Sequence, residues 1–264
     1  FEAYWQDKFS NNVLPLRVGN DVATIDDVMG VIETLSSRRE YTKSNPFVVL
    51  LGKGEHQITS SWTNPSDGSE FATTLSTTRS NITFVGTGKD TTKILGGFVI
   101  ENVENITFKN MTVTNTSEED NGIHMRRGIH ISNAQVELFD VALKGCGHIG
   151  LSIPYTPAET IVVATRCEFA NSQWGAVVEG NLSSAKFNNC VFNDNDGDGI
   201  QGRQSTIHLH GKATAIHSNR GDGIWAHMSA KVVIHLPSHH NTIYNNGNLD
   251  RRTNRGGTIT NVED

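Results

Sequence analysis

The stretch DGDGIQGR (residues 196–203) contains a Gly-Asp-Gly-Ile run that returns 24 residues later in GDGIWAH (residues 221–227). Both runs continue with alternating apolar and polar residues, which is the pattern of a β-strand. Similar Gly-apolar pairs are spaced 28, 25, 24 and 24 residues apart, beginning at Gly122, Gly150, Gly175, Gly199 and Gly223. A period in the twenties, filled by short strands and Asn/Gly turns, predicts an all-β solenoid in which each turn of the chain adds one rung to several parallel sheets.

Equivalent inward residues of successive rungs are expected to stack into ladders, because neighbouring strands lie ~4.8 Å apart. The first predicted ladder comprises Ile123, Leu151, Ala176, Ile200 and Ile224. The second comprises Val113, Leu143, Phe169, Phe192, Ile216 and Ile243. Cys167 and Cys190 occupy equivalent places in two rungs, which favours stacked free thiols over a disulfide. Stacked amides are also expected to hydrogen bond between rungs at one turn, from Asn171, Asn193 or Asn195, Asn219 and Asn245.

The two ends of the chain differ from the repeats. Residues 24–40 (TIDDVMGVIETLSSRRE) carry apolar residues at helical spacing, with Thr24 as the N-cap, so a helix is expected to cover the open end of the first rung. Residues 256–264 (GGTITNVED) predict one more strand without a cap. We therefore expect the natural chain to continue past Asp264, or a partner to cover that end.

The first rungs have a characteristic order of helix, strand, Gly turn and Ile-Thr-Phe strands. It is formed by VVLLGKGEHQI (residues 48–58) and by the segment from NITFVGTG to NITFKNMTVTN (residues 81–115). From about Ile25 to its end, the chain resembles the right-handed parallel β-helix superfamily, also called pectin-lyase-like. The resemblance implies a right-handed parallel β-helix solenoid with an N-terminal α-helical cap. Residues 1–45 would form the N-terminal segment and cap, and residues 46–264 the β-helix of the same domain.

Composition excludes some classes of function. A net charge of −6 over 264 residues provides no electrostatic footprint for nucleic acid, and no apolar stretch reaches membrane-spanning length. Because the chain begins with Phe1 and shows no charged-then-apolar leader, we expect a processed product or an excised fragment.

Strand alternation predicts which side chains line the outer face of one sheet. The first outward column is predicted to be His124, Ser152, Val177, Gln201 and Trp225. The second is predicted to be Arg126, Pro154, Glu179, Arg203 and His227. Many members of the resembled superfamily are polysaccharide lyases, hydrolases or epimerases that work along such a sheet. A glycan could lie along the stack, with sugar rings on Trp225 and uronate carboxylates on arginine.

A lyase needs a base beside the uronate carboxylate and a cation that holds the developing charge. The candidate catalytic residues are Arg203 or His227 as base, with Glu179 orienting Arg203. The candidate substrate-binding residues are Arg126, Gln201, Trp225 and His124, with Arg126 as the carboxylate clamp. The alternative is that opposite charges on neighbouring rungs only stabilise an exposed sheet.

Two clusters raise the question of metal binding. Asp194, Asp196 and Asp198 alternate before Gly199 like the start of a calcium loop, and Asp222 is expected to stack on Asp198, so Ca²⁺ is the candidate cofactor. Turn formation explains the same aspartates. The second cluster could bind a transition metal or form a pH-sensitive patch, although a solvated surface is favoured; its members are His208, His210, His235, His239 and His240, with His210 over His235.

The segment CGHIGLSI (residues 146–153) resembles the Gly-His-Gly segment of polygalacturonases, but the other polygalacturonase motifs are missing. The signatures of pectinesterases, pectate lyases and alginate epimerases are absent as well. Two hypotheses follow. The chain is an extracellular or cell-surface domain that binds or processes a polysaccharide, or it is a non-catalytic structural or adhesive module, part of a longer chain or an assembly, with end-to-end or lateral self-association.

Overall fold

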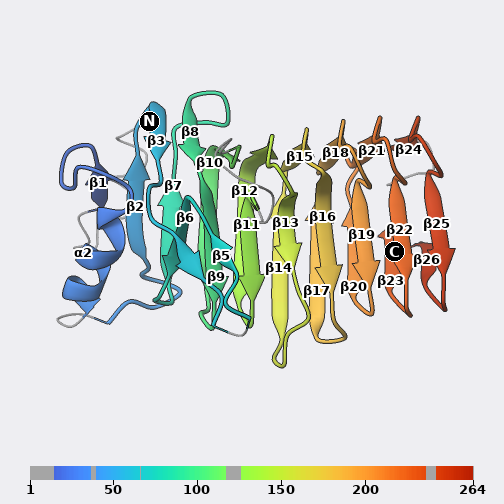
Figure 1. The fold of residues 1–264 in the computed structure, drawn as a ribbon, viewed down its shortest axis with the longest axis horizontal. Helices are drawn as coiled ribbons and strands as arrows, with labels where there is room; N and C mark the ends of the chain where they lie inside the picture. The colour runs from blue at the N-terminus through green and yellow to red at the C-terminus, as the bar shows by residue number, and fades with distance from the viewer. Residues whose placement is uncertain (1–14, 37–39, 66, 117–125, 236–241, 264) are drawn as a thin grey trace.

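The computed structural model describes residues 15–36, 40–65, 67–116, 126–235 and 242–263, and these form a long stack of parallel rungs (Figure 1). The strands belong to a 16-stranded sheet, an eight-stranded sheet and one two-stranded hairpin. Every pair in the two large sheets is parallel. The prediction of an all-β parallel solenoid is therefore confirmed.

The larger sheet has two runs of strands that share β10 and β12. The first run is β1 (Leu16–Val18), β2 (Phe47–Leu51), β7 (Ile82–Val85), β10 (Ile106–Thr114), β12 (Gln135–Lys144), β14 (Thr160–Thr165), β17 (Ser183–Asn188), β20 (Thr206–His210), β23 (Lys231–His235) and β26 (Thr258–Val262). The second run adds β3 (Gly54–Gln57), β8 (Thr92–Leu95), β15 (Glu168–Ala170), β18 (Val191–Asn193), β21 (Ala215–His217) and β24 (Ile243–Tyr244).

The eight-stranded sheet forms the face that carries the predicted site. Its strands are β6 (Thr74–Thr77), β9 (Gly97–Glu101), β11 (Ile129–Ser132), β13 (Ile149–Ile153), β16 (Trp174–Glu179), β19 (Ile200–Arg203), β22 (Ile224–His227) and β25 (Arg251–Asn254). The antiparallel hairpin consists of β4 (Trp62–Thr63) and β5 (Glu70–Phe71).

The helix α2 (Asp27–Ser36) lies at the N-terminal end of the stack (Figure 1). Thr24 lies three residues before it and makes the reciprocal bonds expected of the predicted N-cap: its Oγ1 accepts a hydrogen bond from the Asp27 backbone N–H (3.4 Å), and the Asp27 carboxylate accepts one from the Thr24 N–H (2.9 Å). Val28 and Ile32 are fully buried and join the solenoid core. No helix in the described part of the chain is both long and apolar enough to cross a membrane.

The predicted core ladders are confirmed, with one correction. The second ladder pairs in register from Val113 to Ile243, and the first from Leu151 to Ile224. The residue that pairs with Leu151 from the preceding rung is Ile129, not Ile123, which lies outside the described residues. The Cys167 and Cys190 thiols are free and buried, as expected.

Close packing explains the glycine that opens each rung. A Cβ atom on Gly199 would lie 2.8 Å from the Gly223 carbonyl oxygen, and one on Gly175 would lie 2.5 Å from the Gly199 carbonyl oxygen. Gly150 faces Gly175 in the same way, at 2.7 Å, and Gly128 faces Gly150. The recurring glycine is therefore required by the close approach of successive backbones. In the rung that contains β11, this glycine is Gly128.

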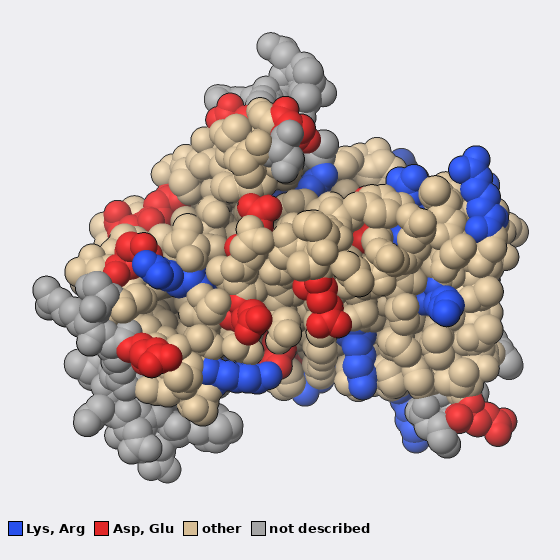
Figure 2. Space-filling model, turned by 90° about the horizontal axis from the view of Figure 1, so that it is seen from below, with Lys and Arg blue, Asp and Glu red and all other residues tan. Residues whose placement is uncertain are grey.

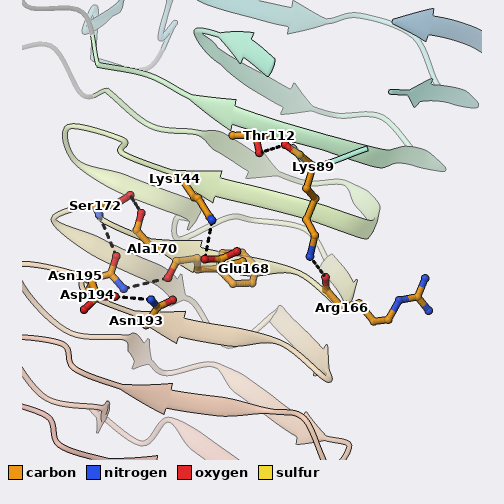
Figure 3. A network of polar contacts seen from close by, with 11 residues as sticks. Lys89, Thr112, Lys144, Arg166, Glu168, Ala170, Ser172, Asn193, Asp194 and Asn195 are labelled. Carbon is orange, nitrogen blue, oxygen red and sulfur yellow. Dashed lines mark hydrogen bonds and ion pairs between the residues drawn. The ribbon is translucent and has the colours of Figure 1, made fainter. Parts of the chain in front are cut away.

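A ladder of side-chain amides runs along one turn, as predicted, but with different end members. Asn195 Nδ2 donates to Asn219 Oδ1, and Asn219 Nδ2 donates to Asn246 Oδ1, both at 2.8 Å. Ser172 precedes Asn195, whose Oδ1 accepts the Ser172 N–H (Figure 3). Asn171 and Asn245, which we expected in the ladder, are exposed and directly precede the ladder residues Ser172 and Asn246. Both adopt positive φ, a backbone conformation that asparagine tolerates because its short polar side chain can hydrogen bond locally.

Candidate functional site

The outward columns of the eight-stranded sheet are confirmed over its central rungs. Val177, Gln201 and Trp225 are in register on β16, β19 and β22, and so are Glu179, Arg203 and His227. The last strand, β25, extends these columns with Arg252 and Asn254, which pair with Trp225 and His227.

The columns differ from the prediction at their N-terminal ends. His124 lies outside the described residues, and Arg126 lies in the turn before β11, where its carbonyl accepts the backbone N–H of His148 (3.0 Å). His130 and Ser132 follow Ile129 and occupy the expected places of His124 and Arg126. The sequence contains two Gly-Ile pairs six residues apart here, and the close approach of Gly128 to Gly150 selects the second.

Arg203 is held in place by contacts along the second column. Its Nη1 donates to Glu179 Oε1 at 2.9 Å, and its Nη2 lies 3.6 Å from the Met228 sulfur. The guanidinium also lies over the Tyr155 ring, 5.9 Å from its centre. The Arg203 side chain remains 36% exposed and that of Glu179 20% exposed. The pair thus presents a fixed guanidinium to solvent.

His227 lies beneath the surface of the same face. Its ring stacks on Trp225, with centres 4.6 Å apart and planes 17° apart, and the residue is only 6% exposed. Burial lowers the pKa of His227, and the positive charges of Arg203, Arg255 and Arg252 lower it further. The imidazole is therefore neutral near pH 7 and chemically able to accept a proton, but few of its atoms are accessible to a substrate.

Arg252 closes the C-terminal side of this cluster. Its guanidinium lies over the Trp225 ring, 4.8 Å from the centre, and its Nη1 bonds Asp222 Oδ2 at 3.2 Å. The Trp225 Nε1–H is buried and has no hydrogen-bond partner among the described residues. The indole therefore packs against His227 and Arg252, whereas we expected it to serve as an open platform for a sugar ring.

The four aspartates of the candidate calcium site have separate surroundings. Asp194 accepts a hydrogen bond from Asn193 Nδ2, whereas Asp196 is exposed and forms an ion pair with Arg220 (2.9 Å). Asp198 and Asp222 are buried, and each accepts a backbone N–H from the next rung: Asp222 N at 2.7 Å and Leu249 N at 3.0 Å. These bonds explain the repeated Gly-Asp-Gly as a turn that links rungs. Calcium binding at the four aspartates stays a prediction.

The N-terminal half of the same face carries a buried polar cluster. His130 Nδ1 lies 2.7 Å from Arg127 Nη1 and 3.2 Å from Ser152 Oγ. Burial, reinforced by the charge of Arg127, lowers the pKa of His130 to about 3, so the ring is neutral. Phe71 and Trp62 of the hairpin lie over this histidine, with ring centres 5.6 and 6.3 Å away. The hairpin therefore covers the face at β11.

Sequence reasoning missed His130 and Arg252 as members of the columns. The pattern GIHIS (residues 128–132) carried the signal for His130, since a glycine is followed by regular alternation. Arg252 lacked such a signal, because Asp250 and Arg251 stand where other rungs have glycine and an apolar residue. Gly247 follows Gly223 by 24 residues but does not begin the next rung, since Ile224 pairs with Arg251.

Comparison with known proteins supports the fold. ORF18 of Geobacillus virus E2 superposes with a TM-score of 0.54 at 11% identity, covering 89% of this chain and 54% of the viral one, so this chain spans about half its length. Pectin methylesterase PemA of Erwinia chrysanthemi gives a TM-score of 0.53 at 12% identity, covering 85% of this chain and 78% of that one. A pectin methylesterase variant solved with a hexasaccharide gives 0.51 at 12% identity, with 95% and 92% covered.

These likenesses extend to the fold alone. No curated protein sequence matches the chain. The model of the family described as right handed beta helix region matches residues 96–262, which include all rungs from β9 to β26. This match spans more than half of the chain and confirms the predicted handedness and superfamily; the protein belongs to the right-handed β-helix family.

Proposed function

We propose that the protein binds an acidic polysaccharide along the outer face of β16, β19, β22 and β25. We call this surface the arginine face and define it by Glu179, Arg203, Trp225, His227 and Arg252. The observation that carries the proposal is the placement of two partly exposed guanidinium groups, those of Arg203 and Arg252, on one sheet and two rungs apart.

The geometry of the rungs suits a polymer. Two rungs correspond to ~9.6 Å along the stack, and Arg203 and Arg252 stand in neighbouring columns, so a chain of sugars that runs obliquely along the stack presents successive anionic groups to Arg203 and then to Arg252. A guanidinium has five N–H donors, and the ion pair to Glu179 or Asp222 uses one of them. Each arginine therefore keeps donors for a ligand carboxylate or sulfate, while the protein carboxylate fixes its direction.

Charge is distributed unevenly along the solenoid. The whole chain has a net charge of −6, but residues 200–264 contain seven Lys and Arg against four Asp and Glu. On the side drawn in Figure 2, Asp and Glu gather over the N-terminal and central rungs, whereas Lys and Arg predominate at the C-terminal end. An anionic ligand is therefore attracted to the rungs that carry the arginine face.

Two structural relatives named above are pectin methylesterases, and one of them was solved with a hexasaccharide. They support the proposal at the level of the fold, because a parallel β-helix can present its sheet to a sugar polymer. The expected location of the protein, outside the cell or at the cell surface, accords with a polysaccharide ligand. We assign binding rather than turnover, because His227 is only 6% exposed. Lyase chemistry at Arg203, His227 and Glu179 stays a prediction.

A second candidate function is a structural or adhesive module. The specific observation in its favour is that the charged groups of the arginine face already bond to one another. The Glu179–Arg203 and Asp222–Arg252 pairs each join one rung to the next. In that case the face serves the stability of the stack, and the partly exposed Glu179–Arg203 pair contributes up to about 1 kcal/mol.

Binding of polygalacturonate, alginate and neutral dextran, with and without Ca²⁺, separates these candidates. We expect the two acidic polymers to bind and dextran not to bind, with an affinity that falls as salt is added. Arg203→Ala with Arg252→Ala should weaken binding by about 100-fold or more, since each of the two arginines loses a charge-assisted hydrogen bond that contributes at least about 1.5 kcal/mol. Absorbance of unsaturated products in the same samples reports lyase turnover.

Arg79→Ala is the matched control, because Arg79 is also half-exposed and paired with a carboxylate, that of Glu33, but lies at the other end of the stack. Its binding should equal that of the unchanged protein. Equal binding by the Arg203/Arg252 variant would overturn the proposal. Absence of binding to every polymer would favour the structural module.

A further inference from the structure

Three histidines converge on the outer side of the larger sheet, away from the arginine face. His208 and His210 come from β20 and His235 from β23. His208 Nδ1 lies 2.9 Å from His235 Nε2, and the His210 and His235 rings stack with centres 3.9 Å apart. One ring nitrogen of each histidine lies within 4.8 Å of those of the other two. Among the His, Cys, Asp and Glu side chains of the described residues, these three form a group whose ligand atoms are close enough to bind one metal ion.

The sheet itself brings the three rings together. His208 and His210 are two apart on one strand, so both point to the same side. The parallel register pairs Leu209 with Ile234, which places His235 beside His210 on the next rung. Leu209 and Ile234 are buried in the core and hold the two strands in place. The three Cα positions are therefore fixed by the fold before any ligand binds, which lowers the cost of binding.

We propose that His208, His210 and His235 bind a divalent transition metal ion of the Zn²⁺ class. Imidazole nitrogen suits Zn²⁺, Ni²⁺, Cu²⁺ or Co²⁺, whereas Ca²⁺ and Mg²⁺ prefer oxygen ligands. Tetrahedral Zn²⁺ with bonds of ~2.0–2.1 Å separates its ligand nitrogens by ~3.4 Å. The contact of 2.9 Å between His208 and His235 therefore needs to lengthen only slightly. The stacked His210 and His235 rings need to tilt apart, because a metal ion lies in the plane of each imidazole that binds it.

The ligand count defines the kind of site. Three protein ligands leave a fourth position of the tetrahedron for water or for a group of a bound molecule. All three histidines are partly buried rather than fully enclosed. The exposed Lys186 is in register with His208 on β17. Its charge opposes a cation, so removing it should tighten binding.

The test is titration of Zn²⁺ into EDTA-treated protein, followed by calorimetry, together with the visible spectrum of added Co²⁺. We expect one equivalent to bind and the Co²⁺ spectrum to gain the intensity of a tetrahedral complex. His208→Ala and His235→Ala should each weaken binding by about 10-fold or more, because even changes outside the ligand shell weaken metal affinity by about 10–100-fold. Lys186→Gln should strengthen it.

His217→Ala is the matched control, since His217 lies on β21 and stacks on Tyr244 instead of the cluster. Its affinity should be unchanged. The proposal is overturned by a Co²⁺ spectrum that stays the same as in buffer, or by equal Zn²⁺ binding in folded His208→Ala and His235→Ala proteins. The latter result would assign binding to other histidines. Because the site lies on a different sheet from the arginine face, either proposal can fail without the other.

Discussion

Replacing Asn219 by alanine should destabilise the solenoid more than its small change in volume implies. Asn219 is buried, and its amide connects three successive rungs. Its Oδ1 accepts the backbone N–H of Asn195 at 3.2 Å as well as the Asn195 side-chain amide at 2.8 Å. Its Nδ2 donates to the Phe192 carbonyl at 3.2 Å and to Asn246 Oδ1.

The magnitude follows from the groups that lose their partner. Two are buried main-chain groups, the Asn195 N–H and the Phe192 carbonyl. Two more lose one of their bonds: the Asn195 side-chain amide keeps its bond to Phe169, and Asn246 Oδ1 keeps its bond to the backbone N–H of residue 219. A buried polar group left without its partner costs about 1–3 kcal/mol. Water can enter the space left by the amide, so the low end applies, and we expect a loss of about 3 kcal/mol in the free energy of unfolding.

Urea unfolding followed by far-UV circular dichroism measures this loss. Asn248→Ala is the control, because Asn248 is an exposed asparagine two residues after the ladder, and its replacement should change stability by less than about 0.5 kcal/mol. A loss below about 1 kcal/mol for Asn219→Ala, or one equal to the control, would refute the reasoning. It would mean that the amide bonds exchange with water at no cost.

Two further predictions concern the Gly-Asp-Gly turns. Gly199→Ala should cost about 1–3 kcal/mol by overpacking, since its Cβ would meet the Gly223 carbonyl oxygen at 2.8 Å, whereas Gly52→Ala, with open space around it, should cost less than about 0.5 kcal/mol in the same urea assay. Burial raises the pKa of Asp198 from 3.8 to about 6, so the folded state takes up the proton first as pH falls, and the stability due to this group declines by about 3 kcal/mol as pH rises from ~4 to ~6. Asp198→Asn should remove that part of the pH dependence in thermal unfolding, and an unchanged profile would contradict the assignment.

The architecture could be predicted because its signal is local and repeated. Alternation along each strand assigned the inward residues from Leu151 to Ile224, and the parallel rungs then placed Gln201 beside Trp225 and Arg203 beside His227. Each of these inferences needs only the spacing within one repeat and the fact that equivalent residues stack.

The same reasoning failed where two local patterns compete or where the pattern is missing. Gly122-Ile123 and Gly128-Ile129 are both acceptable rung starts, and the backbone contact between Gly128 and Gly150 decides between them. The amide ladder shows the same limit, since Asn245 and Asn246 are adjacent, and only the position of Asn219 shows which one bonds.

The chain alone was sufficient to determine the period, the β-helical fold, the inward ladders and the face on which Glu179, Arg203, Trp225 and His227 lie. Tertiary structure decided which parts of that face are accessible. The hairpin packs over His130, and Arg252 packs over Trp225, through contacts between segments more than 20 residues apart. Such contacts depend on the path of turns and on the direction of individual side chains, and these have no period that a sequence pattern could reveal.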